Sequence, residues 1–265
     1  MELDLKQMEI LLGTLTLRPY VFVFLAIYLL GASGQFGSKP TFVFLPLGYL
    51  VAFLSELCSI NWGFPYGDYY YIEATRDKEL WIMGVPFMDS ISYVFIAACS
   101  YSTALFLMTP VGRSNWEKRA HGEKSVWILA SLLMVLLDVV VDPVALRGEK
   151  WFLGKIYGYR EEGAYFGVPM SNFVGWLFVA IIMTKIFQSL VGKWGKRTTG
   201  PWWNGIPIWS LWGPALYLGI IAFNLAVTYW IGEFTLAIAS TFIAGTFFFL
   251  ALFWTVYKIR HRRHG

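Results

Sequence analysis

Residues 138–143 read Asp-Val-Val-Val-Asp-Pro, residues 157–165 read Tyr-Gly-Tyr-Arg-Glu-Glu-Gly-Ala-Tyr, and residues 166–176 read Phe-Gly-Val-Pro-Met-Ser-Asn-Phe-Val-Gly-Trp. Two acids end an otherwise apolar segment, a polar loop rich in aromatic residues follows, and a Gly-Val-Pro unit opens the next apolar segment. This order is typical of two membrane spans joined by a loop that carries a functional site.

The same order of features occurs earlier in the chain. Glu56 ends an apolar segment, residues 64–71 read Phe-Pro-Tyr-Gly-Asp-Tyr-Tyr-Tyr, and a Gly-Val-Pro unit at 84–86 opens the next one. The two Gly-Val-Pro units lie 83 residues apart, and this offset aligns Asp89 with Asn172 and Tyr93 with Trp176. The pattern predicts a parallel internal repeat, a kind known in membrane folds, although two unrelated helix starts with Gly and Pro would look similar.

The composition is that of an integral membrane protein. Of 265 residues, 57% are hydrophobic and 14% are charged, whereas a soluble domain carries about 25% charged residues. Several runs reach the roughly 20 apolar residues that a transmembrane helix needs. The predicted spans are 17–33, 41–59, 81–109, 125–145, 167–190, 209–231 and 234–257. We expect an all-α integral membrane protein of about seven transmembrane helices, one transmembrane domain over residues 1–265, in which helices 2 and 3 repeat as helices 4 and 5.

Basic residues predict the orientation in the membrane. With the C-terminus in the cytoplasm, the inner loops and the tail contain more Lys and Arg than the outer loops. This places the N-terminus outside and both aromatic loops on the outer face, in what we expect to be the inner membrane of a prokaryotic cell. The net charge of +4 is modest and gives no reason to expect a nucleic-acid partner.

Four acidic residues are candidate catalytic groups, because charged side chains inside a bilayer are costly and face the interior of the helix bundle. Asp138 and Asp142 are four residues apart, so a helix presents both carboxyl groups on one face. Glu56 and Asp89 are expected at a similar depth. Burial and mutual repulsion would keep at least one of these groups protonated near neutral pH, as a general acid requires. The alternative is that the acids pair with Arg147, Arg160 or loop amides as structural anchors.

Aromatic residues of the repeated unit are candidates for the wall of a pocket. They include Tyr66, Tyr69 and Tyr71 in the first half and Trp176 in the second. Tyr and Trp also gather at membrane interfaces whatever the function. Aromatic faces stabilise cations, so an acid beside aromatic faces suits a reaction that passes through a carbocation.

Other chemistries have little support in the sequence. His121, His261 and His264 all lie in basic loops or the tail, so we expect no buried histidine metal site. The chain contains no P-loop and no dinucleotide-binding glycine fingerprint. We therefore expect no cofactor.

The quoted residues resemble the carotenoid hydratases of the CruF type, the carotenoid 1,2-hydratases and bisanhydrobacterioruberin hydratases. The residues that carry the resemblance are Glu56, Gly63–Tyr71 and Gly84–Pro86 in the first half, and Asp138–Pro143, Gly148, Trp151 and Tyr165–Trp176 in the second. The resemblance covers residues 50–180, and the rest of the chain agrees only in hydropathy. The chain departs from the family at Tyr66, where Phe is usual, and at Leu137, where Trp is usual.

The resemblance implies cofactor-free addition of water across the terminal double bond of an acyclic carotenoid, such as lycopene or a bacterioruberin precursor. Protonation of the alkene at its less substituted carbon leaves a tertiary cation, and capture of this cation by water gives a tertiary alcohol. The residue pattern agrees, because it supplies acids and aromatic shielding. The expected partners are the carotenoid and the lipid bilayer.

Under this hypothesis we assign a role to each candidate residue. The roles are proton donor (Asp138 or Asp142), tuning of the donor or orientation of the water (Glu56 and Asp89), water binding (Asn172) and lining of the polyene end (Tyr66, Tyr69, Tyr71 and Trp176).

Three alternatives remain open from the sequence. A lycopene-cyclase-like enzyme would protonate the same end group but let the cation close on a neighbouring double bond. A prenyltransferase-like enzyme would use Asp138-x-x-x-Asp142 with Mg²⁺ as half of a diphosphate site, although a full second motif is missing. A carotenoid- or lipid-binding protein, or a transporter with the acids as a proton relay, would leave the polyene unchanged.

Overall fold

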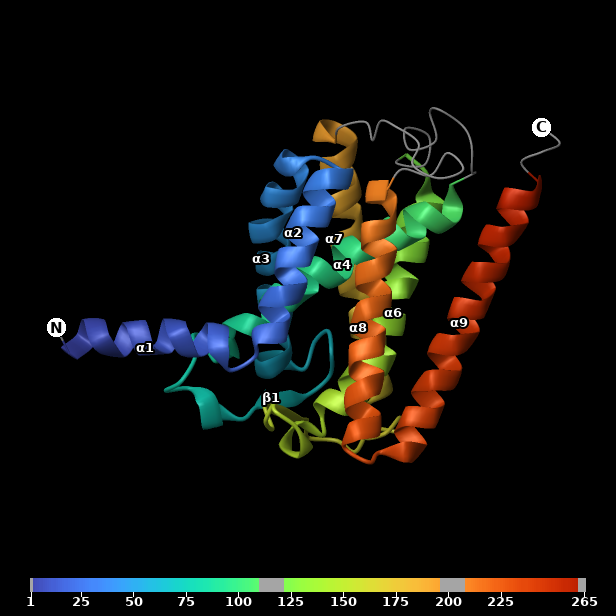
Figure 1. The fold of residues 1–265 in the computed structure, drawn as a ribbon. Coiled ribbons are helices and arrows are strands. Elements are labelled where there is room, and N and C mark those ends of the chain that lie inside the picture. The colour runs from blue at the N-terminus through green and yellow to red at the C-terminus, as the bar shows by residue number, and fades with distance from the viewer. Residues whose placement is uncertain (1, 110–121, 196–207, 262–265) are drawn as a thin grey trace.

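The computed structural model describes residues 2–109, 122–195 and 208–261, and most of them are helical (Figure 1). The helices are α1 (Glu2–Thr16), α2 (Pro19–Gln35), α3 (Ser38–Trp62), α4 (Phe87–Met108), α6 (Lys124–Ala145), α7 (Met170–Trp194), α8 (Trp212–Trp230) and α9 (Phe234–His261). Four short strands lie in the connections, namely β1 (Tyr69–Tyr71), β2 (Trp81–Ile82), β3 (Val85–Pro86) and β4 (Tyr157–Tyr159). The prediction of an all-α membrane fold is confirmed.

Six of the described helices are long and apolar enough to cross a membrane, and the bent pair α1–α2 would be the seventh. A helix suits this setting because it satisfies its own backbone hydrogen bonds in lipid. The sequence prediction missed α1, because this short segment with acidic residues lacks the hydropathy of a span. α1 meets α2 at an angle of 73° and projects sideways from the bundle (Figure 1).

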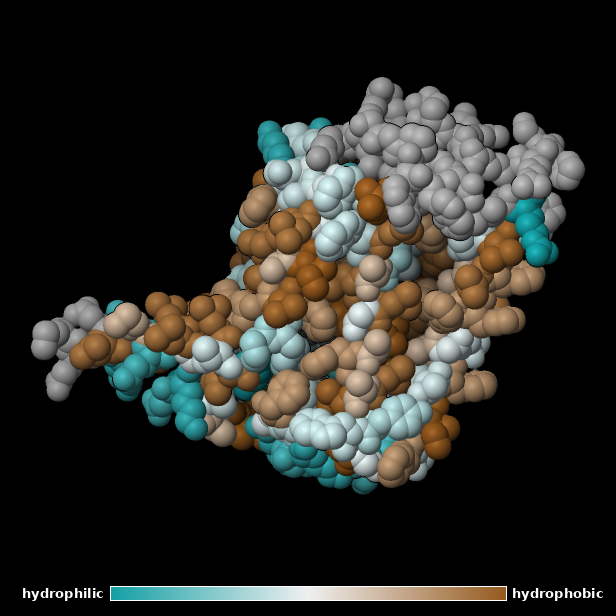
Figure 2. All heavy atoms as spheres, in the orientation of Figure 1, coloured by the Kyte–Doolittle hydropathy of each residue, from teal (hydrophilic) through white to brown (hydrophobic). Residues whose placement is uncertain are grey.

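Helix α4 is the centre of the bundle. Of its apolar span 83% is buried, compared with 22% for α9, which stands apart at the edge of the bundle (Figure 1). Figure 2 shows that apolar side chains cover much of the outward surface of the helices, as contact with lipid chains requires. Hydrophilic side chains lie at the loop end that carries β1 and β4, and also along α1 and at the opposite end of the bundle.

Each Gly-Val-Pro unit belongs to a tight turn. Positive φ angles occur at Met83 (49°), Gly84 (86°), Phe166 (50°) and Gly167 (92°). Ile82 pairs with Val85 across the first turn, and Tyr165 pairs with Val168 across the second. Glycine adopts such angles without a steric penalty, which explains why each unit begins with this residue.

These turns correct the predicted starts of two spans. The predicted spans began at residues 81 and 167, but α4 begins at Phe87 and α7 begins at Met170. Proline lacks a backbone N–H and favours an extended residue before it. The Gly-Val-Pro unit therefore precedes the helix as an extended segment and does not form the first turn of the helix.

The two halves match in structure at the predicted offset. The bridge between Ile82 and Val85 has a counterpart 83 residues later, between Tyr165 and Val168. The positive φ angles within the first turn also recur at the same offset in the second turn. The aligned residues Tyr93 and Trp176 stack face to face, with ring centroids 4.4 Å apart and an interplanar angle of 9°. Equivalent residues meet in this way close to a two-fold axis. These observations support the internal repeat.

A short antiparallel ladder joins the two aromatic loops at one end of the bundle (Figure 1). In this ladder Tyr69 lies opposite Tyr159 and Tyr71 lies opposite Tyr157. Both strands read Tyr-x-Tyr, and their tyrosines are arranged symmetrically around the central pair, although the two patterns lie 88 residues apart and not 83. The ladder agrees with the expectation that both loops lie on the same side of the membrane.

Helix α7 packs tightly on the first aromatic loop at Gly175, where an added Cβ would lie 2.4 Å from the carbonyl oxygen of Pro65. We expect Gly175→Ala to lower the free energy of unfolding by about 1–3 kcal/mol, because an overpacked contact with backbone forces the backbone to move. Gly192→Ala, on the same helix, is the matched control, since a Cβ there would meet nothing within 4 Å. Thermal unfolding in detergent measures both variants, and equal melting temperatures would contradict the tight contact.

Candidate active site

A cavity of about 140 Å³ lies inside the bundle beside the β1–β4 ladder. One water molecule needs about 10–15 Å³, so the cavity has room for several waters, or for a small end group with a water. The residues predicted from the sequence all line it, namely Glu56, Tyr66, Tyr69, Tyr71, Asp89, Asp138, Asp142, Asn172 and Trp176. The fold thus brings the candidate residues of both halves together.

In the first half, Glu56 of α3 and Asp89 of α4 share the hydroxyl of Tyr71. This hydroxyl lies 2.8 Å from Oε2 of Glu56 and also contacts Oδ2 of Asp89. Oε1 of Glu56 accepts a hydrogen bond from the hydroxyl of Tyr93. A phenol has one hydrogen to donate, so both contacts of Tyr71 are hydrogen bonds only when one of the two acids carries a proton. The pair is therefore arranged to hold a proton.

In the second half, the side chain of Asn172 on α7 bridges Asp138 and Asp142 on α6. Its amide donates to Oδ2 of Asp138 at 2.8 Å and to Oδ2 of Asp142 at 3.2 Å. Asp142 also accepts a hydrogen bond from Tyr157 and another, at 2.9 Å, from Tyr159. Among the described side chains, Asp142 thus has three donors and Asp138 has one. Hydrogen-bond donors favour the charged form of a carboxyl group, so Asp142 is the better stabilised carboxylate of the pair.

The tyrosines that contact these acids remain protonated. Burial raises the pKa of Tyr157 and Tyr159 well above the ordinary tyrosine value, and the adjacent Asp142 raises the pKa of both further. Burial, followed by the neighbouring Asp89, has the same effect on the pKa of Tyr71. The phenols therefore keep their hydrogens at physiological pH and act as fixed donors to the carboxyl groups.

The alternative in which loop arginines anchor the acids is wrong for both arginines. Arg147 pairs with Glu233 at 3.0 Å, and Arg160 pairs with Asp68 at 3.1 Å. Neither arginine lines the cavity. The ion pairs between described residues include none of the four cavity acids. The hydrogen-bond partners of these acids are instead neutral phenols and an amide.

The sequence does not single out Tyr157 and Tyr159, although both belong to the quoted loop. Each donates a hydrogen bond to Asp142. The signal that would have found them is the Tyr-x-Tyr pattern, which occurs at residues 69–71 and again at 157–159. Tyr93 has a partial signal, because the repeat aligns it with Trp176 but gives no hint that its hydroxyl contacts Glu56.

Aromatic and apolar side chains form the rest of the cavity wall. Trp176 stacks on Tyr93, and its ring centroid lies 6.0 Å from that of Tyr66. Tyr20 and Phe24 of α2 and Ile220 of α8 also line the cavity. The cavity therefore combines carboxyl groups with aromatic faces and an apolar wall.

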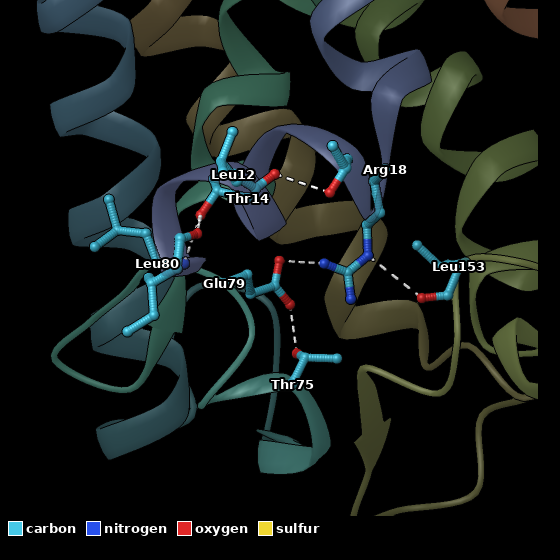
Figure 3. A network of polar contacts seen from close by, with 9 residues as sticks. Leu12, Thr14, Arg18, Thr75, Glu79, Leu80 and Leu153 are labelled. Atoms are coloured by element: carbon cyan, nitrogen blue, oxygen red, sulfur yellow. Dashed lines mark hydrogen bonds and ion pairs between the residues drawn. The ribbon is translucent and has the colours of Figure 1, made fainter. Parts of the chain in front are cut away.

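A buried ion pair fixes the connections beside the cavity (Figure 3). Arg18, at the bend between α1 and α2, pairs with Glu79, and its Nε donates to the carbonyl oxygen of Leu153 at 3.3 Å. Thr75 donates a further hydrogen bond to Glu79. Only 1% of each charged side chain is exposed. Because Leu153 lines the cavity, this network ties the N-terminal bend to the cavity wall.

Comparison with known proteins assigns the chain to a family. The family model described as carotenoid biosynthesis protein matches residues 7–248. The chain belongs to the carotenoid biosynthesis protein family. The chain is similar to the bisanhydrobacterioruberin hydratase of Haloarcula japonica, with 28% identity over 144 residues. The match covers 54% of this chain and 43% of that hydratase. No solved structure gives a significant match.

Membership of the carotenoid biosynthesis protein family places the chain in carotenoid biosynthesis. The polar residues that line the cavity include four acids and several tyrosines, together with Asn172, Asn224 and Ser92. Carboxyl groups and phenols in an otherwise apolar cavity suit proton transfer to an apolar substrate. Within the described ranges, no group of three or more His, Cys, Asp or Glu side chains is arranged to hold a metal ion. His121 and His264 lie outside the described residues.

Proposed function

We propose that this carotenoid biosynthesis protein adds water to the terminal C=C bond of an acyclic carotenoid and produces a tertiary alcohol. The observation that carries the proposal is the meeting of four carboxyl groups in one cavity with aromatic walls. The similarity to a protein named a hydratase supports the same reaction. The motifs in both halves of the chain that resemble those of carotenoid hydratases agree with this similarity.

Asp138 is the proton donor in this mechanism. Asn172 is its one hydrogen-bond donor among the described side chains, so Asp138 is the acid of the second half that is less stabilised as a carboxylate. The π electrons of the terminal double bond form a new C–H bond with the Asp138 proton, at the carbon that carries one hydrogen. The positive charge then lies on the adjacent carbon, which carries three alkyl groups.

Water captures this cation, and the Asp138–Asp142 pair restores the proton balance. The Asp142 carboxylate stabilises the cation by its charge and accepts a proton from the water after the new C–O bond forms. The pair has then lost one proton and gained one, and the net change is the addition of one water molecule. The faces of Trp176 and Tyr66 add cation–π stabilisation and limit access of other nucleophiles.

This mechanism changes the role predicted for Asn172. A side-chain amide has two hydrogens, and Asn172 directs both to carboxyl oxygens. We therefore assign Asn172 to the orientation of Asp138 and Asp142 and not to the binding of water. Glu56 and Asp89 hold their shared proton on the other side of the cavity, where they tune the charge that surrounds the cation.

The substrate in this proposal is an acyclic carotenoid like lycopene or bisanhydrobacterioruberin. The cavity receives its end group, and the aromatic rings of Tyr20 and Phe24 and the apolar side chain of Ile220 contact the adjoining part of the polyene. The proposal includes a single membrane domain over residues 1–265 in a prokaryotic inner membrane. Its N-terminus and aromatic loops lie outside, and its C-terminus lies in the cytoplasm.

Pigment analysis of a host that makes lycopene, with and without this chain, tests the proposed function. We expect a new pigment that is heavier than its precursor by one water molecule for each end that reacts, and we expect a chelator of divalent cations to leave its formation unchanged. A new pigment of unchanged mass would favour a cyclase. Unchanged pigments would favour a binding protein or a transporter, and loss of activity with the chelator would favour a prenyltransferase-like site. Each of these three results contradicts the proposal.

A further inference from the structure

The hydroxyl of Tyr69 is buried and has no hydrogen-bond partner in the described part of the chain. A few other described side chains have a buried polar atom of this kind, but Tyr69 is the one among them that also lines the cavity. Only 5% of the residue is exposed. Buried polar groups in folded proteins nearly always have a protein or water partner. The open hydroxyl is therefore a place for a water molecule inside the cavity.

Tyr69 lies between the two sets of acids. Its ring centroid is 5.4 Å from that of Tyr71, which contacts the first pair of acids. The centroids of Tyr157 and Tyr159, which contact Asp142, are 6.1 Å and 6.0 Å away. These three tyrosines direct their hydroxyls to carboxyl oxygens. In the described ladder Tyr69 is the tyrosine that lines the cavity and leaves its hydroxyl available.

We propose that Tyr69 holds the water molecule that captures the carbocation. This inference rests on the hydratase function proposed above and adds the residue that positions the nucleophile. The phenol oxygen accepts one hydrogen of the water, and the Asp142 carboxylate accepts the other. A lone pair on the water oxygen then remains free to bond with the cationic carbon. The water proton that faces Asp142 passes to this carboxylate after the C–O bond forms.

Loss of this water changes the fate of the cation, and the change can be measured. Without a positioned nucleophile, the cation returns a proton from an adjacent carbon to a carboxylate, and an alkene forms again. In D₂O the acids exchange their protons for deuterons, so each round of protonation and return carries deuterium into the alkene. Protonation and water capture therefore have separate readouts, namely deuterium in the recovered alkene and the amount of alcohol.

The test compares Tyr69→Phe with the unsubstituted protein in membranes supplied with an acyclic carotenoid in D₂O. The unsubstituted protein should form alcohol with deuterium on the carbon next to the carbinol carbon. Tyr69→Phe should form alcohol about 2- to 13-fold more slowly, as expected from the loss of one hydrogen bond. Deuterium should still enter the recovered alkene at the original rate or faster. The matched control is Tyr70→Phe, on a neighbouring residue that is 43% exposed and does not line the cavity.

Two results would overturn the assignment of Tyr69. One is alcohol formation at the original rate in Tyr69→Phe, and the other is parallel loss of alcohol and deuterium exchange at an unchanged protein level and melting temperature. The second result would mean that Tyr69 acts in protonation. If the unsubstituted protein forms neither alcohol nor deuterated alkene, the hydratase function itself fails, which is a different result from the failure of Tyr69.

Discussion

Asp138→Asn is expected to reduce the rate of hydration by roughly 10²- to 10⁴-fold, the usual contribution of a general acid. Asparagine keeps the size of the side chain and its contact with Asn172 but carries no acidic proton. Deuterium exchange into the alkene should fall by the same factor, because protonation itself is lost. Binding of the carotenoid should persist, since the aromatic wall is unchanged. The measurement is the amount of alcohol and labelled alkene formed per unit of membrane protein.

Asp68→Asn is the matched control for this prediction. The chemical change is the same, but Asp68 pairs with Arg160, its side chain is 55% exposed, and it does not line the cavity. The Asp68→Asn variant should hydrate the carotenoid at the original rate. Full activity in Asp138→Asn together with loss of activity in Asp89→Asn would contradict the assignment and move the proton donor to the first half.

Hydropathy predicts the spans of this protein well, because a long uncharged run has few alternatives to a membrane helix. The predicted span 125–145 corresponds to α6 at Lys124–Ala145, and the predicted span 234–257 lies within α9. The starts of α4 and α7 were wrong because Gly and Pro are compatible with a helix start as well as with a turn. The choice depends on the positive φ angles at Gly84 and Gly167, which local sequence does not fix.

The meeting of the acids could be predicted for a physical reason, since a buried charge in a membrane must face the interior of the bundle. Their hydrogen-bond partners could not be predicted in the same way. Tyr157 and Tyr159 reach Asp142 only because β4 pairs with β1 in one particular register. Strands of three residues carry little information about register, and the pairing joins loops that are far apart in the chain.

The Arg18–Glu79 pair was also beyond sequence reasoning. Arg18 lies at the start of the predicted span 17–33, Glu79 lies in the connection before the predicted span that starts at residue 81, and 61 positions separate the two. The bend between α1 and α2 removes Arg18 from water, and the packing of the connection before β2 does the same for Glu79 (Figure 3). Contacts that depend on how connections fold over one another have no periodic signal in the sequence.

Glu79→Gln is expected to lower the free energy of unfolding by about 3–5 kcal/mol, because it leaves a fully buried guanidinium group without its counter-charge. Unfolding of the protein in detergent micelles measures the change. Glu73→Gln is the matched control, since Glu73 pairs with Arg76 and the two side chains are 56% and 57% exposed. An exposed pair contributes about 0–1 kcal/mol, so this control should unfold almost like the unsubstituted protein.

A double variant separates the loss of charge balance from the loss of packing. Replacing a buried ion pair with apolar side chains of similar volume is often neutral, so Arg18→Met combined with Glu79→Leu should recover most of the stability that Glu79→Gln loses. Recovery should be incomplete, because Arg18 also donates to the carbonyl oxygen of Leu153 and Thr75 also donates to Glu79. If Glu79→Gln unfolds like the unsubstituted protein, the pair does not hold the bend. If the double variant is no more stable than Glu79→Gln, the side-chain hydrogen bonds and not the charge pairing hold the connections against the cavity wall.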